Sequence, residues 1–386
     1  MRLAPCFARP LRRCAIAAGA LFAPWLAAAG QASLSSQGFG YAPGQFSTRA
    51  QGTGGAVGEM DPMSPINPST IAVFPSRILF FQADPEFKTV TSRTGTDRTS
   101  IARYPVVFAA MPIRGSLVMS LSSSTLLDRT STTTFNTTQP LGGGDSVLMT
   151  TTYHIDGAMN DVRLAGGWTP VAWLRVGLGA HAIAGHNLVD LKQSFPDSER
   201  FATFTQSRIL GFSGSAVSGG FQVVTNDLNF SASARIGGSL HLSSEDTLIT
   251  AARVPNHFGA SLAYTGITNS AISIRTAKDN WSALRGLGTA GLTSVDVWDT
   301  SVGADIQGPK IGQRYLFLRG GVRTRTLPFQ ASNQNVTETS FSGGIGTSFA
   351  SGHVMTDLAA IRATRKANVD ASEHAWTVSF GVAVRP

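Results

Sequence analysis

The chain contains long segments in which apolar and polar residues alternate. In residues 229–243, apolar or small residues lie at every second position from Phe230 to Leu242, and the positions between them are Asn, Ser, Gly, Arg or His. The same period of two recurs in residues 173–185, 341–350 and 376–385. A period of two is typical of an extended strand with one apolar face. These segments therefore predict β-strands.

The predicted strands are long. Each runs for about ten residues or more, as a tilted membrane-spanning strand requires, whereas strands of soluble sheets usually have about five or six. Further candidate strands lie at residues 78–83, 104–112, 116–122, 147–155, 162–168, 203–211, 258–265, 271–276, 295–306, 313–326 and 353–364. The total is about fourteen. Turns are expected at 141–145, 244–246 and 308–310, and an exposed loop at 130–139.

The beginning of the chain has the layout of a secretory signal. Four arginines among residues 2–13 make it basic, an apolar run follows from Cys14 to Leu26, and small residues ending at Ala32 suit cleavage. The apolar run is well short of the roughly 20 residues that a membrane helix needs. We expect export of the chain and removal of residues 1–32, with Ala29 as the alternative cleavage point.

Composition narrows the class of protein. Only 14% of residues are charged, against about a quarter in typical soluble domains. Cys6 and Cys14 both lie in the signal, so residues 33–386 have no thiol. Loss of four arginines lowers the formal net charge from +8 to +4 (8 − 4 = 4), and without a Lys/Arg block we expect no nucleic acid partner. Export and strand length favour an all-β, transmembrane antiparallel β-barrel of about 14 strands over a soluble sandwich.

No motif indicates catalysis or a cofactor. Gly286 to Gly291 match GxGxxG, but the residues that follow predict a strand, whereas a dinucleotide site needs a helix. The sequence has no GxSxG elbow and no HExxH motif, and its seven histidines are scattered. We expect no enzyme, no cofactor and no metal site. A hydrolase with a Ser–His–acid group on the barrel wall stays open as an alternative.

Three arginines share the polar face of one predicted strand. Arg319, Arg323 and Arg325 lie in the sequence Leu-Arg-Gly-Gly-Val-Arg-Thr-Arg. They could pair with Asp or Glu and brace a barrel lumen. They could also bind an anionic head group such as a carboxylate through paired hydrogen bonds. Both interpretations stay open, and the three residues are our candidates for ligand binding.

The stretch before the first strand differs from the rest of the chain. Residues 47–72 are too rich in Gly and Pro for a helix or a long strand, and too apolar for a solvated tail. They include Gly54-Gly55-Ala56, Asp61 and Asn67-Pro68. We expect a compact, tightly turned segment.

This stretch resembles the N-terminal signature of the FadL family of outer-membrane transporters, whose relatives include TodX-like hydrocarbon channels and the more distant PorV group. Ser69 stands where the family usually has Ala. Two later stretches also resemble the family, in the same order: Pro255 to Tyr264 with Trp281-Ser282, and Arg319-Gly-Gly321 with Pro328. The chain ends in Arg385-Pro386, whereas outer-membrane barrels commonly end in an aromatic residue.

The resemblance implies an organisation of the exported chain. Residues 33–74 would form a hatch or plug inside the lumen of a barrel made by residues 75–386. The hatch or gating residues would be Gly54, Gly55, Ala56, Asp61, Asn67 and Pro68. Gly and Pro turns can hold alternative backbone positions at little steric cost, and the sequence leaves open whether the hatch moves or is fixed.

The resemblance also implies a function. A hydrophobic compound such as a long-chain fatty acid would be captured outside, pass to an inner pocket, and leave sideways through the wall beside a kinked strand. Uptake would be passive, because transfer into lipid is favourable. The implied partners are outer-membrane lipid and lipopolysaccharide, the hydrophobic ligand, and the barrel-assembly machinery. The alternative is a PorV-like barrel that acts as a docking component of a secretion system.

Overall fold

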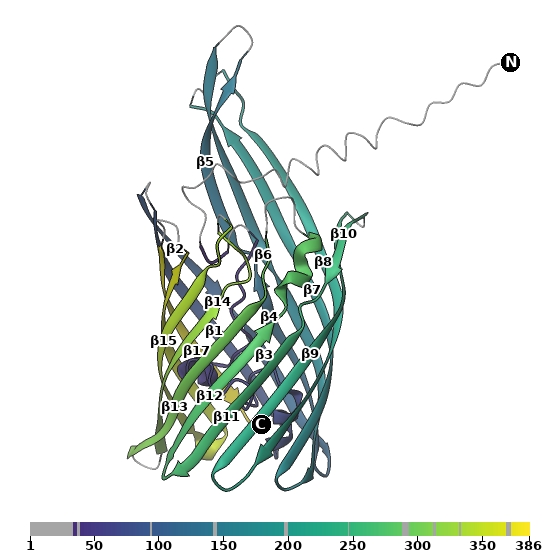
Figure 1. Cartoon of the computed structure of the whole chain (residues 1–386), viewed down its shortest axis with the longest axis vertical. Coiled ribbons are helices and arrows are strands. Elements are labelled where there is room, and N and C mark those ends of the chain that lie inside the picture. Colours follow the sequence, from purple (N-terminus) through teal and green to yellow (C-terminus); the bar gives the residue numbers. More distant parts are fainter. Residues whose placement is uncertain are drawn as a thin grey trace, which may run out of the picture.

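The computed structural model describes residues 34–36, 39–92, 95–141, 145–196, 200–245, 247–287, 293–311, 314–331, 333–367 and 372–386. The predicted signal, residues 1–32, lies outside the described residues. The structure is a closed antiparallel β-barrel of 14 strands, which confirms the predicted fold class (Figure 1). None of the helices in the described residues is long and apolar enough to cross a membrane.

The wall consists of seventeen labelled strands. They are β1 (Ile78–Ser92), β2 (Gly95–Arg103), β3 (Val106–Arg114), β4 (Leu117–Asp128), β5 (Ser131–Pro140), β6 (Ser146–Val171), β7 (Leu174–Ser194), β8 (Phe204–Val224), β9 (Leu228–Ser244), β10 (Thr247–Arg253), β11 (His257–Ile267), β12 (Ser270–Asp279), β13 (Val297–Ile311), β14 (Arg314–Thr326), β15 (Thr337–Phe349), β16 (Val354–Lys366) and β17 (Ser372–Val384). Three strands of the wall are each divided into two labelled strands. β2 and β3 both pair with β1, β4 and β5 both pair with β6, and β10 and β11 both pair with β9. The seventeen labels therefore correspond to fourteen wall strands.

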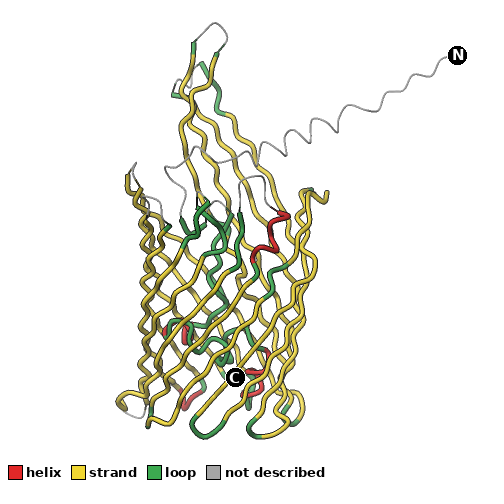
Figure 2. The backbone as a smooth tube through the Cα atoms, viewed as in Figure 1, coloured by secondary structure: helices red, strands yellow, loops and turns green. Residues whose placement is uncertain are grey.

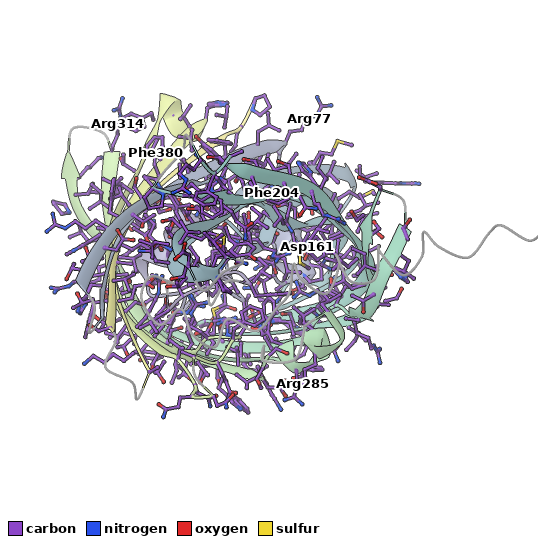
Figure 3. The ribbon with its side chains drawn as sticks, turned by 90° about the horizontal axis from the view of Figure 1, so that it is seen from above. Arg77, Asp161, Phe204, Arg285, Arg314 and Phe380 are labelled. Carbon is purple, nitrogen blue, oxygen red and sulfur yellow. The ribbon has the colours of Figure 1, made fainter. Side chains whose placement is uncertain are left out.

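The barrel closes where the first strand pairs with the last, with Leu79 opposite Val384 and Thr91 opposite Ser372. The alternation places side chains either on the outer face of the barrel or in its lumen. Leu178, with 75% of its surface exposed, and Phe341, with 61%, face outward, as lipid-facing residues of a membrane barrel do. Figure 3 shows Asp161 inside the ring of strands and Arg314 at its outer rim.

Two local predictions were wrong. Residues 130–139 are not a loop, because β5 pairs with β6 from Ser131–Ile155 to Pro140–Ser146; threonine is β-branched and suits strands. Residues 308–310 do not end a strand, because β13 continues through a bulge between Gln307 and Lys310. A proline is compatible with a bulge, where one ladder hydrogen bond is already missing.

The face assigned to Leu240 and Leu242 was also wrong. Their spacing puts them on the lipid-facing side with Phe230, but both are buried inside the barrel, at 0% and 2% exposure. The β8–β9 register shifts between Gly214 and Ala216, opposite Leu240 and Gly237. A bulge inserts one extra residue and so exchanges the two faces of the strand beyond it.

The two ends of the barrel differ. At one end the strands are joined by short turns, such as Asn226–Asp227 between β8 and β9 and Thr268–Asn269 between β11 and β12. At the other end the connections include η2 (Trp281–Leu287) and residues 327–336, and β5 to β8 rise above the rim. Short periplasmic turns and longer outer loops are typical of outer-membrane barrels. We name these the short-turn end and the long-loop end.

Candidate functional site

The interior of the barrel is occupied by the chain's own beginning. Residues 39–74, which we name the N-terminal segment, run inside the barrel and include α2 (Thr48–Gly52) and η1 (Pro68–Val73) (Figure 2). α2 contacts β14 to β17, and η1 contacts β4 and β6 to β8. Near the long-loop end, Tyr41 exchanges both backbone hydrogen bonds with Asp128, at 2.7 and 2.8 Å. The segment is therefore attached to opposite sides of the wall.

Asp61, one of the predicted hatch residues, links two parts of this segment through Ser47 and Ser64. Ser47 caps α2 by accepting a hydrogen bond from the Ala50 amide, as serine commonly does at helix starts. The Asp61 carboxylate accepts hydrogen bonds from the hydroxyls of Ser47 (2.5 Å) and Ser64 (2.7 Å). Asp61 thereby links the start of α2 at Ser47 to the turn at Ser64.

The glycine pair makes the sharp turn after α2. Gly54 and Gly55 have φ of +68° and +88°, a left-handed conformation that favours glycine. Ala56 follows with no exposed surface. A side chain on Gly54 would meet the Val322 amide nitrogen at 2.9 Å. The pair therefore both turns the segment and brings its backbone against the wall.

Asn67 and Pro68 begin the second helix. The Asn67 side chain accepts hydrogen bonds from the Ser69 amide (3.0 Å) and hydroxyl (2.7 Å), and it donates one to the Glu59 carbonyl (2.9 Å). Pro68 occupies the first helical position, where its missing N–H has no cost. Gly220 lies so close that a side chain there would overlap the Asn67 amide.

The strongest attachment is a buried carboxylate that the sequence analysis missed. Glu59 has no exposed surface. Its oxygens accept hydrogen bonds from Ser233 (2.5 Å) and from Arg275 (3.0 and 3.2 Å), and His257 lies 3.2 Å away. We name these four residues the Glu59 cluster. The available signal was an acid within an apolar, Gly-rich stretch of a chain with little charge.

The Glu59 carboxylate is held in its ionised form. Burial by itself raises its pKa, but the hydrogen bond from His257 and the charge of Arg275 outweigh burial and lower the pKa of Glu59 to about 2. A pKa below the ordinary value means that the folded state favours the charged group. The cluster therefore attaches the segment to β9, β11 and β12 by a charge-assisted contact.

Wall glycines make room for the segment. A side chain at Gly177 would lie 2.5 Å from the Ser69 amide nitrogen, one at Gly381 would lie 2.6 Å from the Thr48 hydroxyl, and one at Gly321 would overlap the Thr53 backbone. The alternation predicts these residues on the lumen face but not what they contact. The segment fits the wall because these positions have no side chain.

The three predicted ligand-binding arginines are paired with carboxylates. Arg319 bonds Asp305 (3.4 Å) and Asp357 (2.5 Å). Arg323 bonds Asp299 (2.8 Å), and Arg325 bonds Glu338 (2.7 Å). Arg325 also donates hydrogen bonds to the Ala42 carbonyl and the Tyr41 hydroxyl of the N-terminal segment. In this conformation they brace the lumen and the segment, and a role in ligand binding stays a prediction.

A Ser–His–Asp group lies on three neighbouring strands. His181 Nδ1 is 2.7 Å from Asp161 Oδ1, and His181 Nε2 is 2.8 Å from the Ser218 hydroxyl. These distances are those of a nucleophile and its base. However, Ser218 is buried, and Asp161 Oδ2 also bonds Arg235 (3.0 Å) and Gln45 (3.0 Å). The group therefore forms part of the network that holds the N-terminal segment.

A large cluster of apolar side chains lies inside the barrel toward the long-loop end. Its members are buried side chains of the wall, of η2 and of the segment, and we name them the upper apolar cluster: Phe39, Ala42, Leu126, Leu127, Ile155, Met159, Ile183, Val189, Leu210, Phe212, Ala216, Leu240, Leu242, Val254, Trp281, Leu284, Leu287, Val297 and Phe329. Leu240 and Leu242 belong to it because of the face exchange in β9.

Two small cavities flank Phe46, at the level where the segment fills the barrel. One, of about 50 Å³, is lined by residues that include Gln45 and Trp281. The other, of about 60 Å³, is lined by residues that include Tyr41 and Glu86. A pocket for a drug-sized ligand usually has at least about 300 Å³. Neither of these two cavities has room for a ligand of that size.

The fold and the filled lumen define the class as a transmembrane β-barrel of the outer-membrane type. A crystal structure of a FadL homologue from Pseudomonas aeruginosa is similar, with a TM-score of 0.62 and 11% identity over 90% of this chain and 99% of that one. The CymD monoaromatic hydrocarbon channel has a TM-score of 0.53 and 13% identity over 88% and 97%. The Pseudomonas putida toluene transporter TodX has 0.51 and 11% over 92% and 97%. The chain thus has the fold of FadL-type and TodX-type channels.

The sequence comparisons identify no family for this chain. The chain matches no protein-family model, and no curated protein matches it. Among the described residues, no group of three or more His, Cys, Asp or Glu side chains is placed to hold a metal ion.

Proposed function

We propose that this protein mediates passive uptake of hydrophobic compounds across the outer membrane. The observation that carries the proposal is the upper apolar cluster, which lies inside the barrel toward the long-loop end and includes Phe39 and Ala42 of the N-terminal segment. Apolar side chains beneath the long loops can bind an apolar solute that a polar lipopolysaccharide leaflet excludes. The fold shared with the FadL homologue and with the TodX and CymD channels supports the same function.

The strand pairing of the wall is broken near the long-loop end. β3 pairs with β4 up to Val106–Ser124, but beyond this point β2 pairs with β1 and β5 pairs with β6. Within the described residues, no ladder joins β2 to β5. The two sides of this break are joined by the ion pair from Arg103 to Asp128 (2.5 Å) and by Tyr41, whose backbone bonds Asp128 and whose ring lies 5.0 Å from the Arg103 guanidinium. We propose that ligand leaves sideways through the wall at this break when Tyr41 moves.

The proposal makes the segment a barrier that must shift. The segment fits closely against the wall, and the two cavities beside Phe46 are too small for a drug-sized ligand. Long-chain fatty acids fit this function, and so do hydrocarbons. The docking role that the sequence leaves open has no specific contact in its favour among the described residues.

Uptake of radiolabelled dodecane by cells with an intact lipopolysaccharide leaflet tests this function. Cells that produce the protein should take up dodecane faster than cells without it, while their permeability to small sugars stays unchanged. Deletion of residues 51–66 should remove the barrier and admit sugars as well. If the intact protein gives no uptake of dodecane or dodecanoate above empty cells, the proposal fails.

A further inference from the structure

A boundary between apolar and polar residues crosses the outer face of the barrel. Where β13 to β17 and β1 lie side by side, the outward residues of one row are Val302, Val322, Phe341, Arg362, Trp376 and Phe87. The next outward residues toward the long-loop end are Thr300, Thr324, Thr339, Thr364, His374 and Thr89. The apolar band of an outer-membrane barrel ends where the lipid head groups begin. The boundary therefore marks the level of the head groups of the outer leaflet.

Three exposed cations lie at this boundary, and we name them the outer cationic patch. Arg362 is in the apolar row, and Lys366 is the second outward residue of β16 beyond it. Arg98, on β2, stands directly opposite Thr89. Neighbouring strands lie about 4.8 Å apart and rise about 3.4 Å per residue, so the three Cα atoms lie within about 16 Å of one another. No ion pair joins any of the three to another residue that the structure describes.

The acidic residues of these strands at this level do not share the outer face. Four of them face the lumen, where they are buried: Glu86, Asp299, Glu338 and Glu373. Asp97 precedes Arg98 directly and therefore points to the opposite face of β2. In the described part of β13 to β17, β1 and β2, the outer face at this level thus carries positive charge without an acid. Such a surface attracts an anionic ligand.

The outer cationic patch also borders aromatic rings. The Arg362 guanidinium lies 5.7 Å from the centroid of the Trp376 ring, and Phe341 stands opposite Arg362 on the other side. Tryptophan is enriched at membrane interfaces, where its ring meets both acyl chains and head groups. Arginine can keep its stem against an apolar surface while its head reaches the polar side, and its paired N–H groups match a phosphate. The arrangement suits a lipid with an anionic head group.

We propose that Arg98, Arg362 and Lys366 bind the phosphate groups of lipopolysaccharide, whose acyl chains lie against the apolar row beside them. Longer loops are typical of the outer side of such barrels, so the patch is in the leaflet that contains this lipid. The patch spans the seam where β1 pairs with β17. One bound lipid therefore contacts the first and the last strand together and stabilises the closed barrel. The site lies on the outer face, so it does not depend on the proposed uptake through the lumen.

Native mass spectrometry of the purified protein in a neutral detergent tests the proposal, because it counts the bound lipids. The wild-type protein should bind lipid A, the phosphorylated lipid part of lipopolysaccharide, at least about tenfold more tightly than dephosphorylated lipid A, because basic side chains at a membrane surface attract anionic lipid. The triple variant Arg98→Gln, Arg362→Gln, Lys366→Gln should lose this preference. The matched control is Lys192→Gln, at an exposed cation of β7 that has Asp190 two residues away on the same face, and it should keep the preference.

Two further readouts separate binding from structure. Lipid A should raise the unfolding temperature of the wild type, followed by heat-dependent gel mobility, but not that of the triple variant. Without lipid, the two proteins should unfold at the same temperature, because exposed charges contribute little to stability. Inorganic phosphate at the same concentration should not displace lipid A, since it has no acyl chains.

Three results would each overturn the inference. They are equal binding of phosphorylated and dephosphorylated lipid A by the wild type, an unchanged preference in the triple variant, and displacement of lipid A by inorganic phosphate. Association of two barrels through the outer cationic patch, with no lipid A bound, would overturn it as well.

Discussion

Replacing Glu59 by Ala should release the N-terminal segment and make the barrel leak. The change leaves Arg275 and His257 facing an empty space in the lumen, although Asp299 and Asp279 still bond them. Removal of one partner of a buried ion pair typically costs about 3 kcal/mol or more. That cost falls on the attachment of the segment, and it raises the population of the released state about a hundredfold.

Conductance of single barrels in a planar bilayer measures this release, as longer or more frequent open events.

Acid provides a second test of Glu59. Because its pKa is lowered from 4.5 to about 2, its contribution is complete above the ordinary pKa and is lost as the pH falls toward 2. The wild type should therefore open more as the pH falls from about 5 to 2, and Glu59→Gln should lack this Glu59-dependent part. Asp227→Asn, in an exposed turn, is the control. Conductance of Glu59→Ala equal to that of the wild type would contradict the assigned attachment.

Gly321→Ala should also displace the segment, whereas Gly320→Ala should not. A methyl group on Gly321 would overlap the Thr53 backbone, but one on Gly320 has no atom nearer than the Ser342 carbonyl oxygen at 3.9 Å. Overpacking costs about 1 to 3 kcal/mol. Both changes place the same residue in the same strand, so they share any effect on strand stability.

Limited proteolysis of the folded barrel reports on this pair. The Gly321→Ala protein should be cleaved within residues 39–74 at a protease concentration that leaves Gly320→Ala and the wild type intact. Both variants should retain the heat-dependent gel mobility of a folded barrel. Equal protection of the two variants would show that the segment does not depend on its close fit against β14.

The sequence was sufficient to predict the barrel because lipid imposes a simple rule on every strand. One face must be apolar, and long alternating segments such as residues 173–185 show this directly. The rule fails where a bulge exchanges the faces, as at Leu240 and Leu242, because a one-residue shift leaves no mark in the alternation itself. The upper apolar cluster was therefore not predictable, although its residues were assigned to strands.

The lumen was harder to predict, because its contacts join residues far apart in the chain. Glu59 meets Arg275 and His257 only because the segment folds back into the barrel, and no local pattern encodes that distance. The turn at Gly54-Gly55 and the helix start at Asn67-Pro68 have local signals, and the structure places both inside the lumen.

In the proposed function, hydrophobic molecules enter through the lumen past a segment that must move. A reversible tether between the segment and the wall tests it most directly. Thr48 Oγ1 and Ser379 Oγ are 2.8 Å apart, so Thr48→Cys with Ser379→Cys should form a disulfide that holds α2 against β17. Dodecane uptake by the same cells is measured before and after reduction, with the single Thr48→Cys variant as control. We predict background uptake in the oxidised form and wild-type uptake after reduction; equal uptake in both forms would contradict the account.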